Sequence, residues 1–137
     1  VLEHLDDDAA GLARAKALLA PGGTLLVTVP ALPALWSAHD EANHHRRRYV
    51  RGELEARIRE AGFDLRFLSY FNSLLLPFAW LARKLRPHAT GLEDHAVPPA
   101  WINGPLYVAF LSEKPLLAAG GRLPIGLSLI AVAQKPS

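Results

Sequence analysis

A short apolar run behind a sharp turn is the feature that most constrains this fold. Residues 24–29 read TLLVTV, a mixture of apolar and β-branched side chains that suits a buried strand covered on both faces. Ahead of this run, residues 12–19 repeat apolar side chains at helical spacing, an aspartate among residues 6–8 can cap that helix, and the PGG at 21–23 ends it. Residues 1–2 read as the end of another buried strand. The order strand, helix, strand predicts a βαβ unit and therefore an α/β domain with a parallel sheet.

The remainder of the chain alternates between helical and extended patterns. A loop of about 20 residues follows the first complete strand, and loops of that length in a compact domain are usually functional or mobile. Further helices are expected at 50–61, with Leu54, Ile58 and Ala61 on its inner face, at 73–85, and at 101–117 with breaks at Pro105 and Pro115. Further strands are expected at 63–71 and 126–134, and a polar connection with no assigned role for His88 or His95 covers 86–99.

Composition excludes several classes of protein. The 137 residues are 50% hydrophobic and 20% charged, which fits one globular domain or a large piece of one. A net charge of only +2 does not demand a nucleic-acid partner, and the absence of cysteine excludes disulfides, thiolate catalysis and cysteine zinc sites. The apolar stretches at 74–82 and 123–133 are too short to span a membrane. We therefore expect a cytoplasmic protein.

Several motifs together resemble a known family. VLEHLDD, LLAPGGTLLVTVPA, AGF before a strand, and the closing GLSLIAVAQK resemble the C-terminal half of class I S-adenosylmethionine-dependent methyltransferases. The similarity is greatest to the bacterial type 11/12, ubiquinone-biosynthesis-like group, whose substrate loop carries W-x-x-H-D followed by H-x-R-R-Y. In this sequence those positions are Trp36, His39, Asp40, His45, Arg47, Arg48 and Tyr49.

The resemblance implies a Rossmann-like sheet of order 3-2-1-4-5-7-6 with strand 7 antiparallel. Residues 1–2 would end strand 4, and the expected strands at 24–29, 65–71 and 126–134 would be strands 5, 6 and 7. The chain is then a truncated class I methyltransferase fold of order 4-5-7-6, with residues 1–137 forming the C-terminal part of a single domain. Roughly 90 to 100 residues of an N-terminal cofactor-binding half are expected before Val1, and the fragment is expected to be inactive alone.

The resemblance also implies where the cofactor binds. Ligands of open α/β sheets lie beyond the carboxyl ends of the strands. Leu2, Glu3 and His4 would border the methionine end of S-adenosyl-L-methionine, and His4 and His45 are the candidate catalytic residues that take a proton from the acceptor. The alternative is that Glu3 and His4 only cap the strand and the following helix.

The loop that carries the second half of the motif can serve as a substrate loop or as a structural pin. As a substrate loop, its site residues would be Trp36, His39, Asp40, His45, Arg47, Arg48 and Tyr49, with arginines binding anionic or carbonyl groups. Asp40 could then fix His45 or an arginine. As a pin, Arg47 or Arg48 would pair with Asp40 or Glu53 and only hold the loop in place. The two roles do not exclude each other.

Metal binding and nucleic-acid binding by this loop are both disfavoured. A metal site of His39, Asp40, His44 and His45 is disfavoured because adjacent side chains diverge and the spacing matches no standard zinc pattern, so we expect no metal. Nucleic-acid binding through Arg46, Arg47, Arg48 and Arg51 around Tyr49 is disfavoured because the rest of the chain lacks a basic stripe.

The expected function is methyl transfer to a small-molecule or lipid-linked acceptor. Arg83, Lys84 and Arg86 at the end of the 73–85 helix could place that helix on a membrane surface, or they could simply complement the helix dipole. Two alternatives remain: a non-catalytic binding or scaffold domain that kept the fold, and a nicotinamide-dependent Rossmann oxidoreductase. The expected antiparallel closing strand argues against the oxidoreductase.

Overall fold

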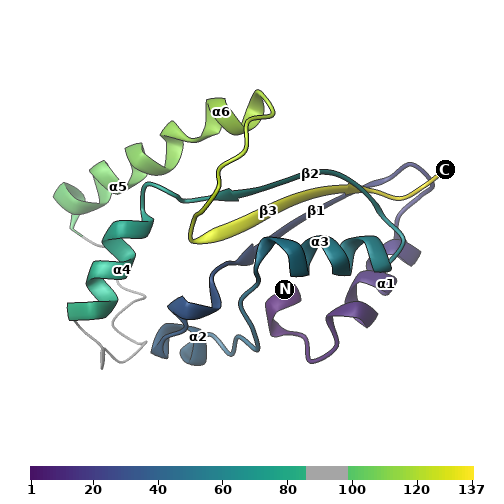
Figure 1. The fold of residues 1–137 in the computed structure, drawn as a ribbon, viewed down its shortest axis with the longest axis horizontal. Helices are drawn as coiled ribbons and strands as arrows, with labels where there is room; N and C mark the ends of the chain where they lie inside the picture. The colour runs from purple at the N-terminus through teal and green to yellow at the C-terminus, as the bar shows by residue number, and fades with distance from the viewer. Residues whose placement is uncertain (86–98) are drawn as a thin grey trace.

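The computed structural model describes residues 1–85 and 99–137 (Figure 1). Its strands are β1 (Thr24–Pro30), β2 (Asp64–Phe71) and β3 (Ser128–Gln134). The helices are α1 (Asp8–Leu18), α2 (Ala38–Ala42), α3 (Arg51–Glu60), α4 (Leu76–Leu85), α5 (Ala100–Ser112) and α6 (Lys114–Ala118), and two 3₁₀ turns are η1 (Leu2–His4) and η2 (Pro33–Leu35).

The three strands form one sheet of order β1-β3-β2, in which β3 is antiparallel to both neighbours. Ser128 at the start of β3 pairs with Pro30 and with Phe71, the last residues of β1 and β2. The carboxyl ends of β1 and β2 therefore meet at one edge of the sheet. The antiparallel direction predicted for the last strand is confirmed.

The prediction of a strand at residues 1–2 is wrong. Leu2–His4 form the 3₁₀ turn η1, in which the His4 and Leu5 amides donate to the carbonyls of Val1 and Leu2. These local i→i+3 bonds replace the ladder that a strand needs, and among the described residues the sheet contains only β1, β3 and β2. Of the expected order 4-5-7-6, the last three strands are present as β1, β3 and β2. The parallel pairing that the βαβ pattern predicted is absent from this sheet, in which β3 pairs with both neighbours in the antiparallel direction.

One face of the sheet is covered by α1, α3 and η1 (Figure 1). Leu54 and Ile58 of α3 are fully buried, as their spacing predicted, and they pack in one core with Leu129 and Ala131 of β3. The expectation that β1 would be covered on both faces is wrong for the described residues, because Leu26 is 62% exposed. Burial alternates along the end of β1, since the helices lie on a single face.

The C-terminal helices depart from the expected pattern at one proline. Pro115 lies in the first turn of α6, where the missing N–H has no cost, so the expected break there is confirmed. Pro105 lies inside α5 and does not end it. Glu113, at the junction of α5 and α6, accepts hydrogen bonds from the Asn72 and Leu74 amides just after β2. Residues 86–98, with Arg86, His88 and His95 among them, lie outside the described residues.

Gly126 gives a test of how closely the chain approaches the sheet at the start of β3. A Cβ at this position would meet the backbone carbonyl of Phe71, which cannot move without disturbing β2. We expect Gly126→Ala to destabilise the protein by about 1–3 kcal/mol in urea unfolding. Gly104→Ala is the matched control, because its Cβ meets nothing within 4 Å and it lies inside α5, so it should be neutral or stabilising. Equal stabilities of the two variants would contradict this packing.

Candidate functional site

The loop after β1 returns to the strand it leaves. The Tyr49 amide donates to the Pro30 carbonyl at 2.9 Å, and the Leu32 amide donates to the Tyr49 carbonyl at 3.1 Å. These bonds form an isolated parallel bridge between Ala31 and Tyr49, directly beyond the carboxyl end of β1. The bridge closes the loop and brings its histidines and arginines to that edge of the sheet.

Asp40 on α2 is the buried centre of this loop. Its carboxylate has no solvent exposure and accepts from the Ser37 amide at 3.0 Å, His45 Nδ1 at 2.9 Å and Arg48 Nε at 2.8 Å. Burial by itself raises the pKa of Asp40, but the hydrogen bonds from Arg48 and His45 outweigh it and lower the pKa below its usual value. Asp40 therefore stays ionised and fixes both partners.

Arg48 joins this carboxylate to the sheet. Its Nη1 donates to the Ala31 carbonyl at 3.0 Å, and its side chain is 5% exposed. The predicted pairing of Arg48 with Asp40 is therefore present. Because two sides of the guanidinium are occupied and the side chain is buried, Arg48 positions the loop in this structure.

A second buried carboxylate, Asp8 at the start of α1, holds the other side of the segment. It accepts from the Tyr49 hydroxyl at 2.9 Å and from Arg47 Nη1 at 3.3 Å, and Arg47 Nη2 also reaches the carbonyls of Leu5 and Asp6. Burial, and then the bond to Asp8, raise the pKa of Tyr49 well above its usual range. Arg47 thus pairs with Asp8. The sequence pattern indicated only that an aspartate among residues 6–8 could cap the helix.

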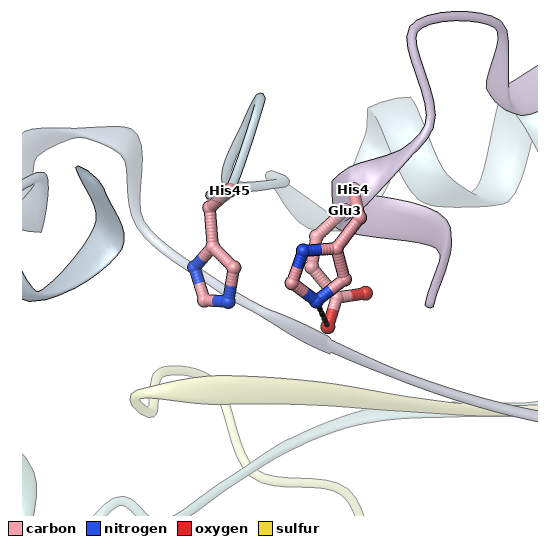
Figure 2. Close-up of side chains that lie close together, drawn as sticks. All are labelled: Glu3, His4 and His45. Atoms are coloured by element: carbon pink, nitrogen blue, oxygen red, sulfur yellow. Dashed lines mark ion pairs between the residues drawn. The ribbon is translucent and has the colours of Figure 1, made fainter. Parts of the chain in front are cut away.

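Glu3, His4 and His45 come together beside this framework (Figure 2). The rings of His4 and His45 meet edge to face with centroids 4.9 Å apart, and His4 Nε2 lies 3.6 Å from Glu3 Oε1. His4 Nδ1 faces the carbonyl of His44 at 3.3 Å. The two candidate catalytic residues, His4 and His45, are therefore adjacent, and Glu3 lies beside them.

The Glu3 carboxylate lies beside the two imidazoles. Its side chain is 13% exposed, against 14% for His45 and 43% for His4, so the cluster can be reached from solvent.

An open hollow of about 240 Å³ adjoins this cluster. It lies over the row where the three strands meet, at the carboxyl ends of β1 and β2 and the start of β3. Its lining residues are Glu3, Thr28, Val29, Pro30, Phe71 and Ser128. This is the edge at which ligands of open α/β sheets bind.

Three predicted site residues stand apart from the cluster. Trp36 is 39% exposed, and its Nε1 lies within 3.4 Å of Glu41 Oε1. His39 lies next to Asp40 on α2, and its carbonyl accepts from the Asn43 side chain. Leu2 is buried in the core rather than lining the hollow.

Comparisons with known proteins agree with this fold. No protein-family model matches the sequence, and no curated protein matches it. The chain is similar to a solved structure, phosphoethanolamine N-methyltransferase 2 of Haemonchus contortus in complex with S-adenosyl-L-methionine. The TM-score is 0.52 and the identity 16%, and the match covers 100% of this chain but only 32% of the methyltransferase. The chain thus has the fold of about a third of that enzyme.

Removing the central carboxylate should have a large effect on stability. Asp40→Asn leaves the buried Arg48 guanidinium without its countercharge, and we expect a loss of roughly 3–5 kcal/mol in urea unfolding. Asp6→Asn is the control, because Asp6 is exposed and its pair with Arg46 should contribute at most about 1 kcal/mol. Similar losses in both variants would show that Asp40 does not organise the loop.

Proposed function

We propose that the chain is part of an S-adenosyl-L-methionine-dependent methyltransferase acting on a small-molecule or lipid-linked acceptor. The observation that carries the proposal is the pair of adjacent imidazoles, His4 and His45, which lie beside Glu3, a residue that lines the hollow at the carboxyl edge. The likeness in fold to a methyltransferase supports it. The activity is proposed for the full-length protein that contains this chain, and the chain alone is expected to be inactive.

The residues at the hollow are suitable for one end of the cofactor. Glu3 presents a largely buried carboxylate that lines the hollow and can accept hydrogen bonds from an amino group such as that of a methionine. Thr28 and Ser128 add polar positions along the strands. When bound, S-adenosyl-L-methionine supplies a methyl group activated by a positively charged sulfur. Leu2 supports this site from the core, and His4 flanks it.

His45 is the better oriented of the two candidate bases. A carboxylate only accepts hydrogen bonds, so the contact with Asp40 requires the proton on His45 Nδ1. Its Nε2 then carries a lone pair that can take a proton from an acceptor hydroxyl or amine. The ionised Asp40 also stabilises the imidazolium that results, in the same way as the carboxylate of a catalytic triad. The ring of His4 contacts the ring of His45, so His4 can relay or share the proton.

His45→Asn tests this role with little disturbance of the loop. The Asn amide can still donate to Asp40, but the variant lacks the lone pair of Nε2. We expect kcat to fall by about 10²–10⁴-fold with a small change in the KM for S-adenosyl-L-methionine. The measurement is release of S-adenosylhomocysteine with a panel of amines, phenols and lipid-linked quinols.

The control is His44→Asn, because His44 is exposed and has a positive φ of 56°, which Asn tolerates. It should retain activity. Unchanged kcat in His45→Asn would contradict the base, and binding without turnover by the parent protein would favour a non-catalytic domain.

We further infer that the C-terminal helices contact a membrane surface that holds the acceptor. In the part of the chain that the structure describes, no helix is long and apolar enough to cross a membrane. Large apolar side chains nevertheless lie exposed on α4 and α5, helices that stand together at one end of the molecule (Figure 1). These side chains are Phe78, Trp80, Leu81, Trp101, Tyr107, Val108 and Phe110. Aromatic side chains at an exposed apolar surface suit the interfacial region of a bilayer.

Liposome flotation can measure this contact. Vesicles of phosphatidylcholine and phosphatidylglycerol should carry the protein upward, and the double variant Phe78→Ser, Trp101→Ser should remain in the lower fractions, because both removed side chains lie on the exposed apolar helices. Leu18→Ser on α1 is the control, since Leu18 is 88% exposed but far from these helices in sequence. Loss of flotation in the control, or its retention in the double variant, would contradict a specific contact.

A further inference from the structure

We propose that Glu3, His4 and His45 bind a divalent transition-metal ion of the Zn²⁺ class. Each residue offers one ligand atom, and the three atoms lie within 4.8 Å of one another. The ion site uses the same lone pairs of Glu3 and His45 that the proposed function assigns to the cofactor and to proton transfer, so a bound ion and methyl transfer exclude each other at this site, and ion binding can be measured without methyl transfer.

The protonation of the two imidazoles follows from their contacts on the side away from the cluster. A carbonyl oxygen only accepts hydrogen bonds, so His4 Nδ1 carries the proton that points to His44, and its Nε2 carries a lone pair. That lone pair faces the Glu3 carboxylate, whose Oε1 lies 3.6 Å away. Two electron-pair donors facing each other repel unless a cation or a proton lies between them.

His45 is arranged in the same way. Its Nδ1 proton points to Asp40, which leaves the lone pair on its second ring nitrogen. Glu3 Oε1 faces His4 Nε2. One ligand atom from each of Glu3, His4 and His45 thus lies within 4.8 Å of the other two, although His45 is more than 40 positions from η1 in the sequence.

The hydrogen bonds that the Nδ1 atoms of His4 and His45 make are of the kind that metal-binding histidines make in proteins. Such a histidine usually donates its second N–H to a carboxylate or a backbone carbonyl, which fixes the tautomer and raises the basicity of the ligand. His45 has the carboxylate of Asp40, and His4 has the carbonyl of His44. A set of two histidines and one glutamate is a common arrangement for Zn²⁺ with an open coordination position.

The three ligand atoms need to move only slightly closer together to bind the ion. With metal–nitrogen distances of about 2.0–2.1 Å, tetrahedral ligand atoms lie roughly 3.3 Å apart. His4 is the most exposed of the three residues and can move toward the other two.

The expectation of no metal rested on the adjacent histidines of the loop alone. In the structure, Asp40 lies behind His45, and His44 contributes its carbonyl, so the candidate ligands come from η1 as well as from the loop.

Calorimetric titration of the purified, EDTA-treated protein with ZnCl₂ tests the proposal. We expect one ion per chain, and we expect Co²⁺ to give the visible absorption of a low-coordinate nitrogen and oxygen site. Glu3→Gln and His4→Ala should each weaken Zn²⁺ binding at least tenfold. His4→Ala should remain folded, since the side chain is 43% exposed, and circular dichroism would verify this.

His44→Asn is the matched control, because it removes the neighbouring imidazole but keeps the backbone carbonyl, and it should bind Zn²⁺ as the parent does. Absence of binding by the parent, or undiminished binding by His4→Ala and Glu3→Gln, would overturn the proposal. A protein that binds Zn²⁺ without methyl transfer would disprove only the proposed function. One that transfers methyl groups without binding Zn²⁺ would disprove only the ion site.

Discussion

The carboxyl edge of the sheet depends on the buried ion pair between Asp40 and Arg48. A buried carboxylate is costly unless donors surround it, and Asp40 meets this condition with the Ser37 amide, His45 and Arg48. Arg48 continues the network to the Ala31 carbonyl, so the loop is attached to the end of β1 through a charged side chain as well as the backbone. The position of His45 follows from the same carboxylate, which means that one interaction sets both the shape of the loop and the orientation of its imidazole.

Asp8 supports the other side of the same segment. Neighbouring residues in an extended chain point in opposite directions, so Arg47 and Tyr49 reach Asp8 on α1 while Arg48 reaches Asp40 on α2. The segment is therefore clamped between two carboxylates from different helices. The two arginines of the motif serve this clamp, and Glu3, His4 and His45 lie together beside it.

The sequence predicted the parts of this fold that local patterns determine. The PGG turn, the apolar run after it and the spacing of Leu54 and Ile58 placed β1 and α3 nearly at their observed bounds. The site was predicted only in part, because Asp8 and Glu113 act across about 40 residues of sequence. In a sequence with many charged residues, the position of one of them does not indicate which distant residue it contacts. The 3₁₀ turn at Leu2–His4 was missed because two apolar residues fit a strand equally well when no neighbouring strand is known.

Three residues near the carboxyl edge adopt left-handed backbone conformations without being glycine: Leu32, His44 and Asn72, with φ of 59°, 56° and 60°. For an ordinary L-residue such as Leu32 this conformation costs about 1–2 kcal/mol, and it persists only where the surroundings determine it. The network around Asp40 therefore offsets conformational strain at Leu32 and His44. Rigidity at this edge is maintained at the expense of global stability, so a glycine at position 32 would relieve strain while loosening the edge that orients the imidazoles.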